Sequence, residues 1–387
     1  MQSTDRAIST RLVHAGEPQE RVEGAVVLPI FQSATFSLGT PGDEDPVHYL
    51  RYSNTPNHRA LHAKLAAVSG GEAALVTGSG MAAISAALLT LLRSGEHLLV
   101  QSGLYGGTQG FLQYDLAELN IGYSPIDGNR PDTWEAALQP KTRAVYVECL
   151  SNPLLEVADL EAVVDFCRRY ELISVIDNTF ASPVNFRPLE WGFDVEIHSA
   201  TKYLNGHSDI VAGCIMGNRD FIERARRKLN ALGGSLDAHT CFLLQRGLKT
   251  LALRMGQQND NALALARLLA EHPAVEKVNY PLLEGHPQQQ RAQRLFEGCG
   301  GVFSFEVKGD VAAAEGLVGR LELAIYAPSL GGVETLIGFP ARTSHVGLSP
   351  QERSAMRVSD KMIRVAAGIE ATADLCADFT QALDALA

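Results

Sequence analysis

The chain contains 387 residues, of which 46 % are hydrophobic and 20 % are charged, and its formal net charge at pH 7 is −11. This composition is typical of a globular protein and excludes intrinsic disorder over most of the length. An acidic chain without a basic cluster is a poor nucleic-acid binder, so we expect no nucleic-acid partner. At about 150 residues per domain, the length predicts two to three domains.

The sequence indicates neither a membrane segment nor a disulfide framework. Its longest mostly apolar stretch, residues 81–92, is too short to span a bilayer and predicts a buried helix. The polar N-terminal segment has no apolar signal core. The closest of the six cysteines, Cys149 and Cys167, are 18 positions apart, so zinc-type spacing is absent. We therefore expect a cytoplasmic protein with reduced thiols and no membrane partner.

The first 60 residues have little hydrophobic periodicity and many turn-forming residues. Segment 35–58 alone contains three prolines and two glycines. Such residues favour turns over helices and strands. We predict that residues 1–60 form an extended N-terminal arm that packs against something else, and a neighbouring subunit is one candidate.

From residue 61 to 245, short apolar segments alternate with helical patterns. At 159–170, for example, apolar side chains fall on one face of a helix. Short apolar strands that alternate with helices predict an α/β fold with a mostly parallel sheet covered on both sides. The predicted strands are residues 73–76, 97–101, 143–149, 172–177, 194–198 and 210–216.

The remainder of the chain has a different pattern. A long helical stretch at 240–271 precedes GGVFSFEVKG at 300–309, where apolar residues alternate with the period of a strand. A second helix and strand set follows and ends in a helical segment at 371–387. The pattern predicts a smaller α+β domain over 246–387.

The segment DVEIHSATKYLNGHSD at 194–209 contains the sharpest candidate site. Lys202 directly follows a predicted strand, with Ser199 and Thr201 beside it. Ligands of open α/β sheets bind outside the carboxyl ends of the strands, so we expect Lys202 to face the binding crevice. Two hydroxyls beside an amine suit an aldehyde that bears a phosphate, because the hydroxyls donate to the phosphate and the amine forms a Schiff base. A solvated lysine at a strand end is the alternative.

Three further features lie at carboxyl ends of predicted strands. Asp177 closes an apolar strand, where it can pair with a pyridinium nitrogen or cap the next turn. TGSGMAA at 77–83 starts an apolar helix whose free amides can bind an anion, although glycines are also usual in tight turns. Tyr105 in LYGGT can stack on a flat cofactor or lie in the core. Together the four features supply phosphate donors, a stacking ring, a pyridinium partner and an amine, which is the set that pyridoxal phosphate needs.

The motifs SATKYLNGHSDIVAG, VIDNTFASP, SGMAAI, LYGGT and PSLGGVETL resemble the Cys/Met-metabolism family of pyridoxal-phosphate enzymes. That family includes cystathionine γ-lyases, γ-synthases and β-lyases, and methionine γ-lyases. The resemblance implies a fold-type-I transferase with an arm (1–60), a pyridoxal-phosphate-binding domain (61–245) and a C-terminal α+β domain (246–387). It also implies an amino-acid substrate and a homotetramer whose paired subunits share active sites.

The resemblance assigns a role to individual residues. It implies that Lys202, Tyr105 and Asp177 are catalytic: they match the lysine that binds the cofactor, the stacking tyrosine and the partner of the pyridine nitrogen. The implied cofactor-binding set adds Tyr49, Arg51, Gly80, Met81, Asn152, Ser199 and Thr201. The implied substrate-binding residues are Asn152, Ser329 and Arg364, of which Arg364 in MIRVAAGIE matches the arginine that takes the substrate carboxylate.

The arm matches the family only with an insertion. Many members have the pattern Y-x-R-x-x-N-P, whose tyrosine and arginine reach the phosphate of the neighbouring subunit. In HYLRYSNTPNH, Tyr49 and Arg51 fit this pattern if one residue is inserted before Pro56. Without the insertion, Tyr52 is the candidate tyrosine.

Two departures from the family bear on the reaction. Gly107 stands where methionine γ-lyases have cysteine, which argues against dedicated methionine cleavage. Pro328 stands where many γ-lyases and γ-synthases have glutamate and β-lyases have tyrosine, so this position does not separate the reactions. We expect a C–S lyase of the cystathionine γ-lyase type. The alternatives are a γ-synthase that replaces the acyloxy group of an activated homoserine, an aminotransferase and a cofactor-binding protein without turnover.

A metal site is not expected. His58 and His62 are four positions apart on a possible helix, but no H-E-x-x-H pattern or third carboxylate ligand accompanies them.

Overall fold

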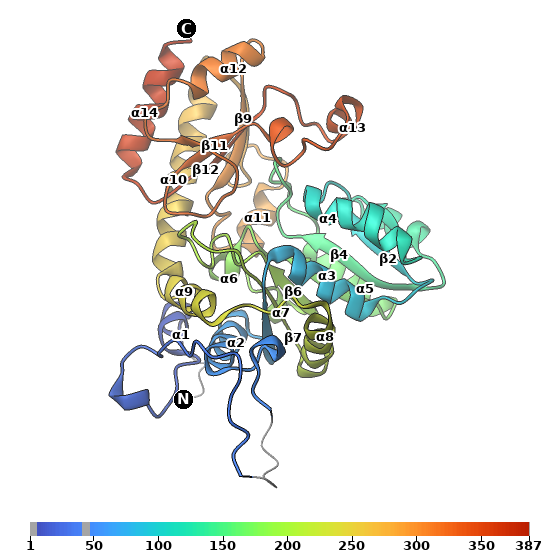
Figure 1. Cartoon of the computed structure of the whole chain (residues 1–387). Helices are drawn as coiled ribbons and strands as arrows, with labels where there is room; N and C mark the ends of the chain where they lie inside the picture. Colours follow the sequence, from blue (N-terminus) through green and yellow to red (C-terminus); the bar gives the residue numbers. More distant parts are fainter. Residues whose placement is uncertain (1–5, 41–46, 387) are drawn as a thin grey trace.

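The computed structural model describes residues 6–40 and 47–386 and is built around two sheets (Figure 1). The larger sheet has seven strands in the order β1-β7-β6-β5-β4-β2-β3. These strands are β1 Ala73–Thr77, β2 His97–Gln101, β3 Gly122–Ile126, β4 Thr142–Glu148, β5 Ile173–Asp177, β6 Val195–His198 and β7 Gly213–Gly217. Strands β3, β2, β4, β5 and β6 are parallel, whereas β7 is antiparallel to both of its neighbours. The predicted α/β class with a mostly parallel sheet is confirmed.

The second sheet is formed by the C-terminal part of the chain, in the order β10-β11-β12-β9-β8. Its strands are β8 Val275–Asn279, β9 Val302–Val307, β10 Ile325–Tyr326, β11 Leu336–Gly338 and β12 Ile363–Ala366. Figure 1 shows α12, α14 and this sheet at the end of the molecule that holds the C-terminus, and α1, α2 and α8 at the other end. The predicted boundaries at residues 60 and 245 stay a prediction.

Fourteen α-helices surround the sheets in the described part of the chain. They are α1 Ile8–His14, α2 Pro56–Ser69, α3 Gly80–Leu91, α4 Gly106–Gly110, α5 Leu160–Arg169, α6 Ser182–Asn185, α7 Pro188–Trp191, α8 Arg219–Leu232, α9 Ala238–Leu248, α10 Leu251–Glu271, α11 Gln289–Leu295, α12 Val311–Val318, α13 Pro350–Ala355 and α14 Thr372–Asp384. Among these described residues, no helix has both the length and the hydropathy needed to cross a membrane.

The large sheet is buried on both faces, as parallel sheets require. One face packs against α3 and α8 through side chains such as Leu75, Ile197 and Phe221. The opposite face packs against α5 and its neighbours through side chains such as Val147 and Ile176. Since both faces are covered, the free surface of the strands is at their ends, where a ligand can reach the main chain.

One predicted helix is divided in the structure. The stretch 240–271 forms α9 and α10, which are separated at Lys249 and Thr250. The carbonyl of Gly247 accepts from the amide and hydroxyl of Thr250 and from Nη2 of Arg254, at 3.2, 3.2 and 2.8 Å. These bonds replace the i→i+4 bond that would have continued the helix. The sequence prediction missed the break because no proline marks it.

The arm is more regular than predicted. Residues 1–5 and 41–46 lie outside the described residues, but Ile8–His14 forms α1, which contacts α2 and α10. Lys64 on α2 donates to the carbonyls of Leu12 and Val13 at 2.8 and 3.1 Å, and so binds the last turn of α1. The prediction of an irregular arm was therefore wrong for this segment. Ile8 and the fully buried Leu12 are four positions apart, a helical spacing that the low overall periodicity of the first 60 residues obscured.

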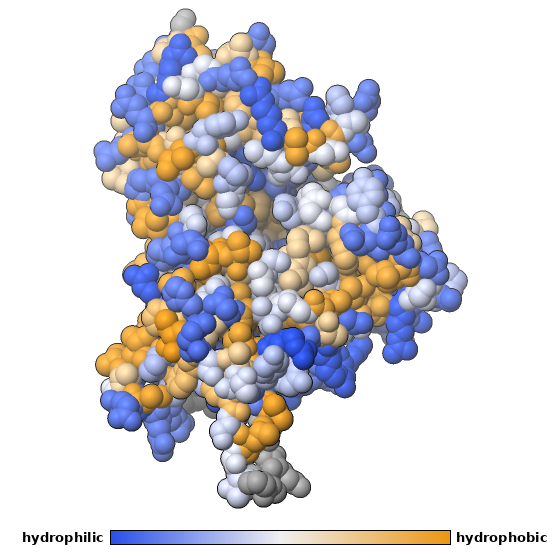
Figure 2. Space-filling model, in the orientation of Figure 1, coloured by the Kyte–Doolittle hydropathy of each residue, from blue (hydrophilic) through white to orange (hydrophobic). Residues whose placement is uncertain are grey.

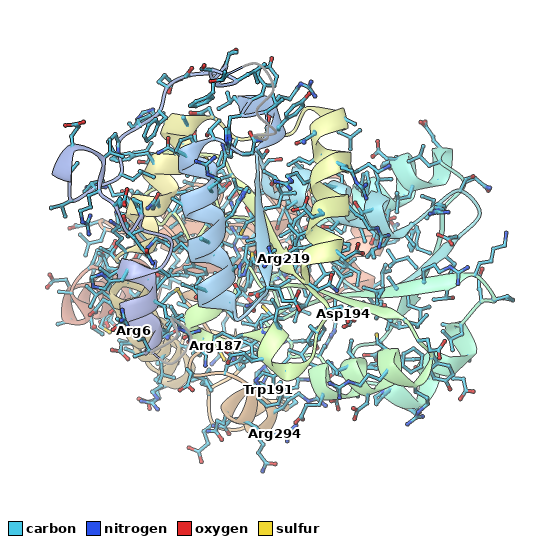
Figure 3. The ribbon with its side chains drawn as sticks, turned by 90° about the horizontal axis from the view of Figure 1, so that it is seen from below. Arg6, Arg187, Trp191, Asp194, Arg219 and Arg294 are labelled. Atoms are coloured by element: carbon cyan, nitrogen blue, oxygen red, sulfur yellow. The ribbon has the colours of Figure 1, made fainter. Side chains whose placement is uncertain are left out.

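The amino ends of β5 and β6 differ from their carboxyl ends. Figure 3 labels Asp194, Arg187 and Trp191 on this underside of the large sheet. The Asp194 carboxylate accepts from the amide and the hydroxyl of Ser174 at 2.8 and 2.7 Å, and Arg187 pairs with Glu190 at 2.8 Å. Polar groups at this end are paired within the chain, which is the usual state of a structural surface.

Candidate active site

A cavity of about 720 Å³ lies at the carboxyl ends of the parallel strands. It is bounded by the start of α3, the segments after β2, β5 and β6, the 328–330 and 342–344 loops, and β12. Every predicted site residue except Tyr49 and Arg51 lines it, namely Gly80, Met81, Tyr105, Asn152, Asp177, Ser199, Thr201, Lys202, Ser329 and Arg364. The chain therefore brings together residues from positions 80 to 364.

One end of the cavity is built to hold an anion. Ser79 caps α3 by accepting from the Ala82 amide at 3.0 Å, and the amides of Gly80 and Met81 have no acceptor in the described part of the chain. A Cβ on Gly80 would lie 2.8 Å from Cβ of Ser199, so only glycine lets the helix start approach this close. Free amides at the start of a twelve-residue helix favour a bound phosphate.

The two hydroxyls predicted for this end are not equivalent. The Ser199 amide donates to Oγ1 of Thr179 at 2.8 Å, and no described residue bonds the Ser199 hydroxyl. The Thr201 hydroxyl donates to the Ala212 carbonyl at 3.1 Å and accepts from the Ala212 amide at 3.0 Å. The Ser199 hydroxyl is thus free to donate, whereas that of Thr201 is engaged with the main chain.

Lys202 directs its amine into the cavity and donates from Nζ to Oγ of Ser329 at 2.6 Å. Burial, and to a smaller degree the charge of Arg364, lower the pKa of Lys202 to about 8. Ser329 has φ of +89°, a conformation that non-glycine residues rarely adopt. Such strain is typical of functional sites, where surrounding contacts hold an unfavourable backbone.

Arg364 lies on β12 in the wall of the cavity and is 9 % exposed. Its Nη2 donates to the Ser329 carbonyl at 2.9 Å and its Nη1 to Oδ1 of Asn152 at 3.3 Å. Neither partner is charged, and no described carboxylate forms an ion pair with it. Burial lowers its pKa, because the charged form is poorly solvated there. A guanidinium in this state favours a bidentate carboxylate ligand.

Asp177 ends β5 in the floor of the cavity. Its Oδ1 accepts from the Thr179 amide at 2.9 Å, and its Oδ2 faces the Tyr146 hydroxyl at 3.4 Å. Burial raises its pKa, and its two bonds to Thr179 oppose that rise. Asp177 lines the cavity and forms no ion pair with a described residue, so its carboxylate is well placed to stabilise a positive ring nitrogen.

Tyr105 precedes α4 and exposes 45 % of its surface. Its amide donates to Oε1 of Glu148 at 2.7 Å. A Cβ on Gly107 would lie 2.5 Å from Cε1 of the Tyr105 ring, so the ring rests directly against that glycine. The ring is available to stack on a flat ligand in the cavity.

Sequence reasoning missed several lining residues. Glu148 and Thr179 come from the strand ends, and Arg342, Thr343 and Ser344 come from a loop after β11. A signal existed for Glu148, since a charged residue near the end of an apolar strand at 143–149 has to face the same edge as Asp177. No local pattern marks the loop residues, because their place depends on tertiary packing.

Tyr49 and Arg51 lie elsewhere in this chain. Arg51 donates from Nη1 to the Asn230 carbonyl at 3.1 Å, near the end of α8, and its guanidinium stacks on the rings of Tyr49 and Tyr52. Neither residue lines the cavity of its own chain.

Residues 9–384 match the family described as Cys/Met metabolism PLP-dependent enzymes. The chain belongs to this family. Among curated relatives, it is 38 % identical to an L-methionine gamma-lyase of Porphyromonas gingivalis, over 98 % of this chain and 97 % of that one. It is also 38 % identical to a cystathionine gamma-lyase of Dictyostelium discoideum, over 99 % of both. A solved cystathionine gamma synthase from Xanthomonas oryzae superposes with a TM-score of 0.95 at 35 % identity, over 98 % of both chains. The predicted fold-type-I architecture is thereby confirmed.

The cofactor of the family is pyridoxal phosphate, and the cavity fits it. The glycine cradle at Gly80 and the free amides beside it match a phosphate, and the unpaired Asp177 matches a pyridine nitrogen. The amine of Lys202 lies in the wall of the same cavity, where it can reach an aldehyde. As a family member, the chain is a pyridoxal-phosphate-dependent enzyme of cysteine and methionine metabolism.

The histidines serve structural bonds. Both ring nitrogens of His58 are engaged, by the Thr55 hydroxyl at 2.7 Å and the Leu236 carbonyl at 2.9 Å. Nε2 of His62 accepts from the Val76 amide at 3.0 Å. Across residues 6–40 and 47–386, no three His, Cys, Asp or Glu side chains gather as a metal site would require.

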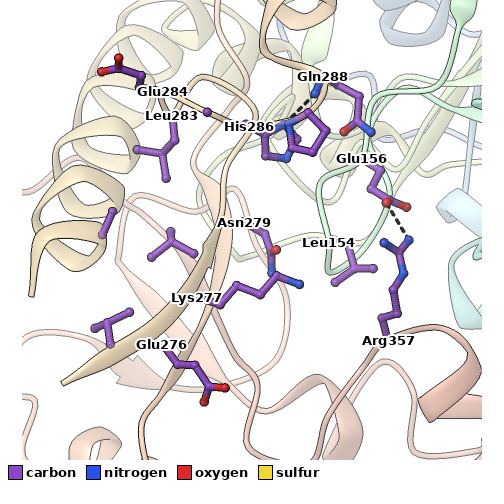
Figure 4. A pocket seen from close by; sticks show the side chains of 15 residues that line it. Leu154, Glu156, Glu276, Lys277, Asn279, Leu283, Glu284, His286, Gln288 and Arg357 are labelled. Atoms are coloured by element: carbon purple, nitrogen blue, oxygen red, sulfur yellow. Dashed lines mark hydrogen bonds and ion pairs between the residues drawn. The ribbon is translucent and has the colours of Figure 1, made fainter. Parts of the chain in front are cut away.

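A second hollow of about 340 Å³ lies beside β8 (Figure 4). Its charged side chains are either paired or exposed to solvent, and Lys277 and Glu284 belong to the exposed group. Glu156 pairs with Arg357 at 2.6 Å, Glu276 pairs with Lys361 at 2.5 Å, and Nδ1 of His286 accepts from the Gln288 amide at 3.2 Å. This pairing distinguishes the hollow from the cavity at the strand ends.

Proposed function

We propose that this enzyme is a C–S lyase of the cystathionine γ-lyase type, acting on a small sulfur-containing amino acid. One observation carries the proposal. Ser329 links the Lys202 amine, through its hydroxyl, to the unpaired Arg364 guanidinium, through its carbonyl, in the wall of one cavity. Removal of a proton from Cα of an amino acid requires a group that binds the α-carboxylate and an amine beside it that accepts the proton.

Substrate recognition begins at Arg364. Its planar fork matches an α-carboxylate by two parallel hydrogen bonds. Asn152 and the Ser329 carbonyl hold the fork in place, since each accepts a bond from one of its terminal nitrogens. The bound carboxylate would set Cα over the floor of the cavity and direct the side chain towards the loop at 342–344.

Proton transfer is the role of Lys202. With a pKa of about 8, a sizeable fraction of its amine is neutral near neutral pH and can accept the Cα proton at Nζ. Ser329 orients Nζ, and the same Nζ can return the proton to the side chain as the sulfur group leaves. Asp177 stabilises positive charge on the cofactor nitrogen, and Tyr105 covers the ring. When bound, pyridoxal phosphate withdraws electrons from Cα.

We further propose that the active site is shared between subunits of a homotetramer. The phosphate end offers amides and hydroxyls but no cation, since the cationic side chains of the cavity are Lys202, Arg342 and Arg364. A phosphate carries about two negative charges at neutral pH. Arg51 of a second copy would supply the missing cation, with Tyr49 beside it.

Exposed apolar residues support such an assembly. Val26, Leu38 and Val47 on the arm expose 74, 62 and 51 % of their surface, and Val211, which lines the cavity, exposes 61 %. Figure 2 shows orange surface on the protruding arm. Clustered exposed apolar groups are typical of subunit interfaces. We also propose that the chain divides at residues 60 and 245 into an arm, a cofactor domain and a C-terminal domain, and the two separate sheets support this division. We place the enzyme in the cytoplasm, because its six cysteines are unpaired.

A γ-replacement reaction is the second candidate. It is supported by the similarity to the solved cystathionine gamma synthase, whose TM-score is 0.95. The two reactions use the same proton transfers by Lys202 and differ in whether a thiol then adds to the substrate.

One panel of assays tests the proposal. The purified protein is incubated with cystathionine, cysteine, methionine, or an O-acylhomoserine with cysteine, and the products are identified by mass. We expect 2-oxobutanoate and cysteine from cystathionine. Cystathionine formed from O-acylhomoserine and cysteine as the faster reaction would establish the second candidate, and no reaction with any of these substrates would refute both.

Mixed subunits test the shared site. Arg51→Ala subunits and Lys202→Ala subunits, each inactive or weakly active alone, should regenerate activity when they form hybrids, because one site per pair then has both residues. Demonstrated hybrids without activity would mean that the arm serves its own chain.

A further inference from the structure

Glu148 is a buried carboxyl group in the cavity wall to which the mechanism above gives no role. It is the last residue of β4 and exposes 6 % of its surface. Its Oε1 accepts from the Tyr105 amide at 2.7 Å, and its own amide donates to Oε1 of Gln101 at 3.0 Å. Glu148 thus connects the end of β4 with the residue that begins α4.

Its neighbour in the sheet is another carboxyl group. Glu148 and Asp177 are direct register partners on the parallel strands β4 and β5, so their side chains lie on the same face. No described cation pairs with Glu148. Two adjacent buried carboxyl groups are costly to ionise together, because each charge repels the other in a poorly solvated place. Burial and the Asp177 charge raise the pKa of Glu148 to about 8.

We propose that Glu148 is a positioning residue that acts as a neutral carboxyl group, holding the Tyr105 main chain over the cavity while leaving Asp177 as the one negative charge beneath the cofactor ring. The proposal rests on the proposed function only in taking Tyr105 as the stacking residue. The oxygen that accepts from Tyr105 needs no charge to do so. A proton on the other oxygen removes the repulsion that a second carboxylate would impose on Asp177.

The ring of Tyr105 depends on this main-chain anchor. Below the ring, Gly107 leaves no side chain between the ring and the backbone of α4. Helix α4 continues directly into the helical segment Phe111–Leu116, but the amide of Tyr105 precedes the first turn, where no carbonyl of the helix can accept from it. A bond from Glu148 to the residue before the first turn therefore fixes where the ring stands.

Three variants of the full-length protein separate the neutral from the charged role. Glu148→Gln keeps an acceptor oxygen and is neutral, Glu148→Asp keeps the carboxyl but shortens its reach, and Glu148→Ala removes the acceptor. Glu196→Gln is the matched control, since Glu196 is fully buried in β6 and bonds Asn178 and His198. In register it pairs with Ile176, so it faces away from Asp177.

Two readouts do not depend on turnover. One is amide hydrogen exchange in the peptide that covers residues 104–110 of the cofactor-free protein, and the other is the dissociation constant of added pyridoxal phosphate. We expect Glu148→Gln and Glu196→Gln to match the unmodified protein within about threefold in both. Glu148→Asp and Glu148→Ala should exchange faster in this peptide and bind the cofactor about tenfold more weakly, as loss of one partner of a buried hydrogen bond predicts.

Each other outcome contradicts the proposal. A Glu148→Gln protein as impaired as Glu148→Ala would show that the negative charge is needed. A Glu148→Ala protein with normal exchange and affinity would show that nothing depends on the anchor. If Glu148→Ala does not fold, Glu148→Asp decides in its place, and normal values for it would overturn the anchor. Failure of the proposed reaction would instead appear as absent turnover in the unmodified protein, with these two readouts intact.

Discussion

The two hollows of this enzyme differ in how their charges are paired. In the cavity at the strand ends, the partly buried amine of Lys202 and the buried guanidinium of Arg364 have only uncharged partners. In the hollow beside β8, Arg357 pairs with Glu156, Glu276 pairs with Lys361 outside the hollow, and Lys277 and Glu284 are exposed to solvent. The comparison teaches that a site is recognised by charges that the fold buries and leaves unmatched, and not by a concave surface alone.

Unmatched buried charges destabilise a folded chain unless something else compensates them. In the cavity, a cofactor and a substrate carboxylate can compensate these charges. The free energy that the unmatched charges cost the ligand-free protein is then regained as binding free energy for these ligands. In the other hollow, the charged groups are either paired or exposed to solvent, so a ligand has less to gain there. Substitutions in the two hollows should therefore affect different quantities.

The largest effect is expected for Lys202→Ala. Lys202→Ala removes the group that accepts the Cα proton in the proposed mechanism, so turnover should fall by at least about 10³-fold. Product formation from cystathionine measures this loss. Borohydride treatment of the unmodified enzyme should fix the cofactor on the peptide that contains Lys202, and fixation on another lysine would contradict the assignment.

Asp177→Asn should be the next most damaging change. An amide cannot keep the ring nitrogen protonated as a carboxylate does, so the cofactor withdraws electrons less strongly. We expect kcat to fall by at least about 10²-fold, or roughly 2.7 kcal/mol of barrier, with the fold intact by circular dichroism. Near-normal turnover would remove Asp177 from the proposed mechanism.

The sequence predicted these residues because parallel strands collect their carboxyl ends at one edge. Asp177, Lys202 and Tyr105 each follow an apolar strand, and such a strand both signals itself and fixes where its end lies. The same reasoning does not predict Arg364, whose role was inferred from the resemblance. Arg364 lies on β12 in the second sheet, and only the tertiary packing of that sheet brings it to the cavity.

Local patterns failed where packing or an unusual residue decides the structure. Strand β3 was missed because it contains Pro125 and lies at the edge of the sheet, where a missing amide is tolerated. Glu148 was missed as a site residue although it ends an apolar strand, and its pairing with Asp177 depends on the strand register, which the sequence does not show. The loop at 342–344 has no periodicity to reveal its place in the cavity wall.

Arg364 variants should separate substrate binding from cofactor binding. Arg364→Ala removes the carboxylate ligand and should lower kcat/KM by about 2–4 kcal/mol, that is, roughly 30- to 900-fold. Arg364→Lys keeps the charge but loses the fork, so KM should rise more than kcat falls. The cofactor absorbance should stay normal in both. Loss of the cofactor with unchanged substrate kinetics in the surviving fraction would indicate a structural role.

The pH dependence of cofactor uptake should report the lowered pKa of Lys202. Only the neutral amine attacks an aldehyde, and an amine with a pKa of about 8 loses its proton as the pH rises through 8. Uptake by the cofactor-free protein should accelerate about 50-fold from pH 6 to pH 8 and level off above it. In Arg364→Ala the rise should extend to higher pH, because a neighbouring positive charge is gone. Continued acceleration of the unmodified protein towards pH 10 would mean an unperturbed lysine.

The smallest effect is expected in the hollow beside β8. Arg357→Ala breaks an ion pair whose two side chains are 62 and 28 % exposed, and such pairs contribute only about 0–1 kcal/mol to stability. A route to the cavity nevertheless exists. Asn279 in this hollow donates to Oγ of Ser304 at 2.9 Å, and that hydroxyl donates at 2.7 Å to the carbonyl of Pro153, next to Asn152.

Because Arg357 takes no part in that chain of bonds, Arg357→Ala should leave kcat/KM within about twofold and lower the melting temperature by no more than a few degrees. Glu156→Gln, which removes the other partner of the pair, should behave alike. Kinetics and thermal unfolding of both variants measure this. A tenfold change in kcat/KM in either variant would mean that the paired charges influence the cavity. That result would contradict the functional difference between the two hollows.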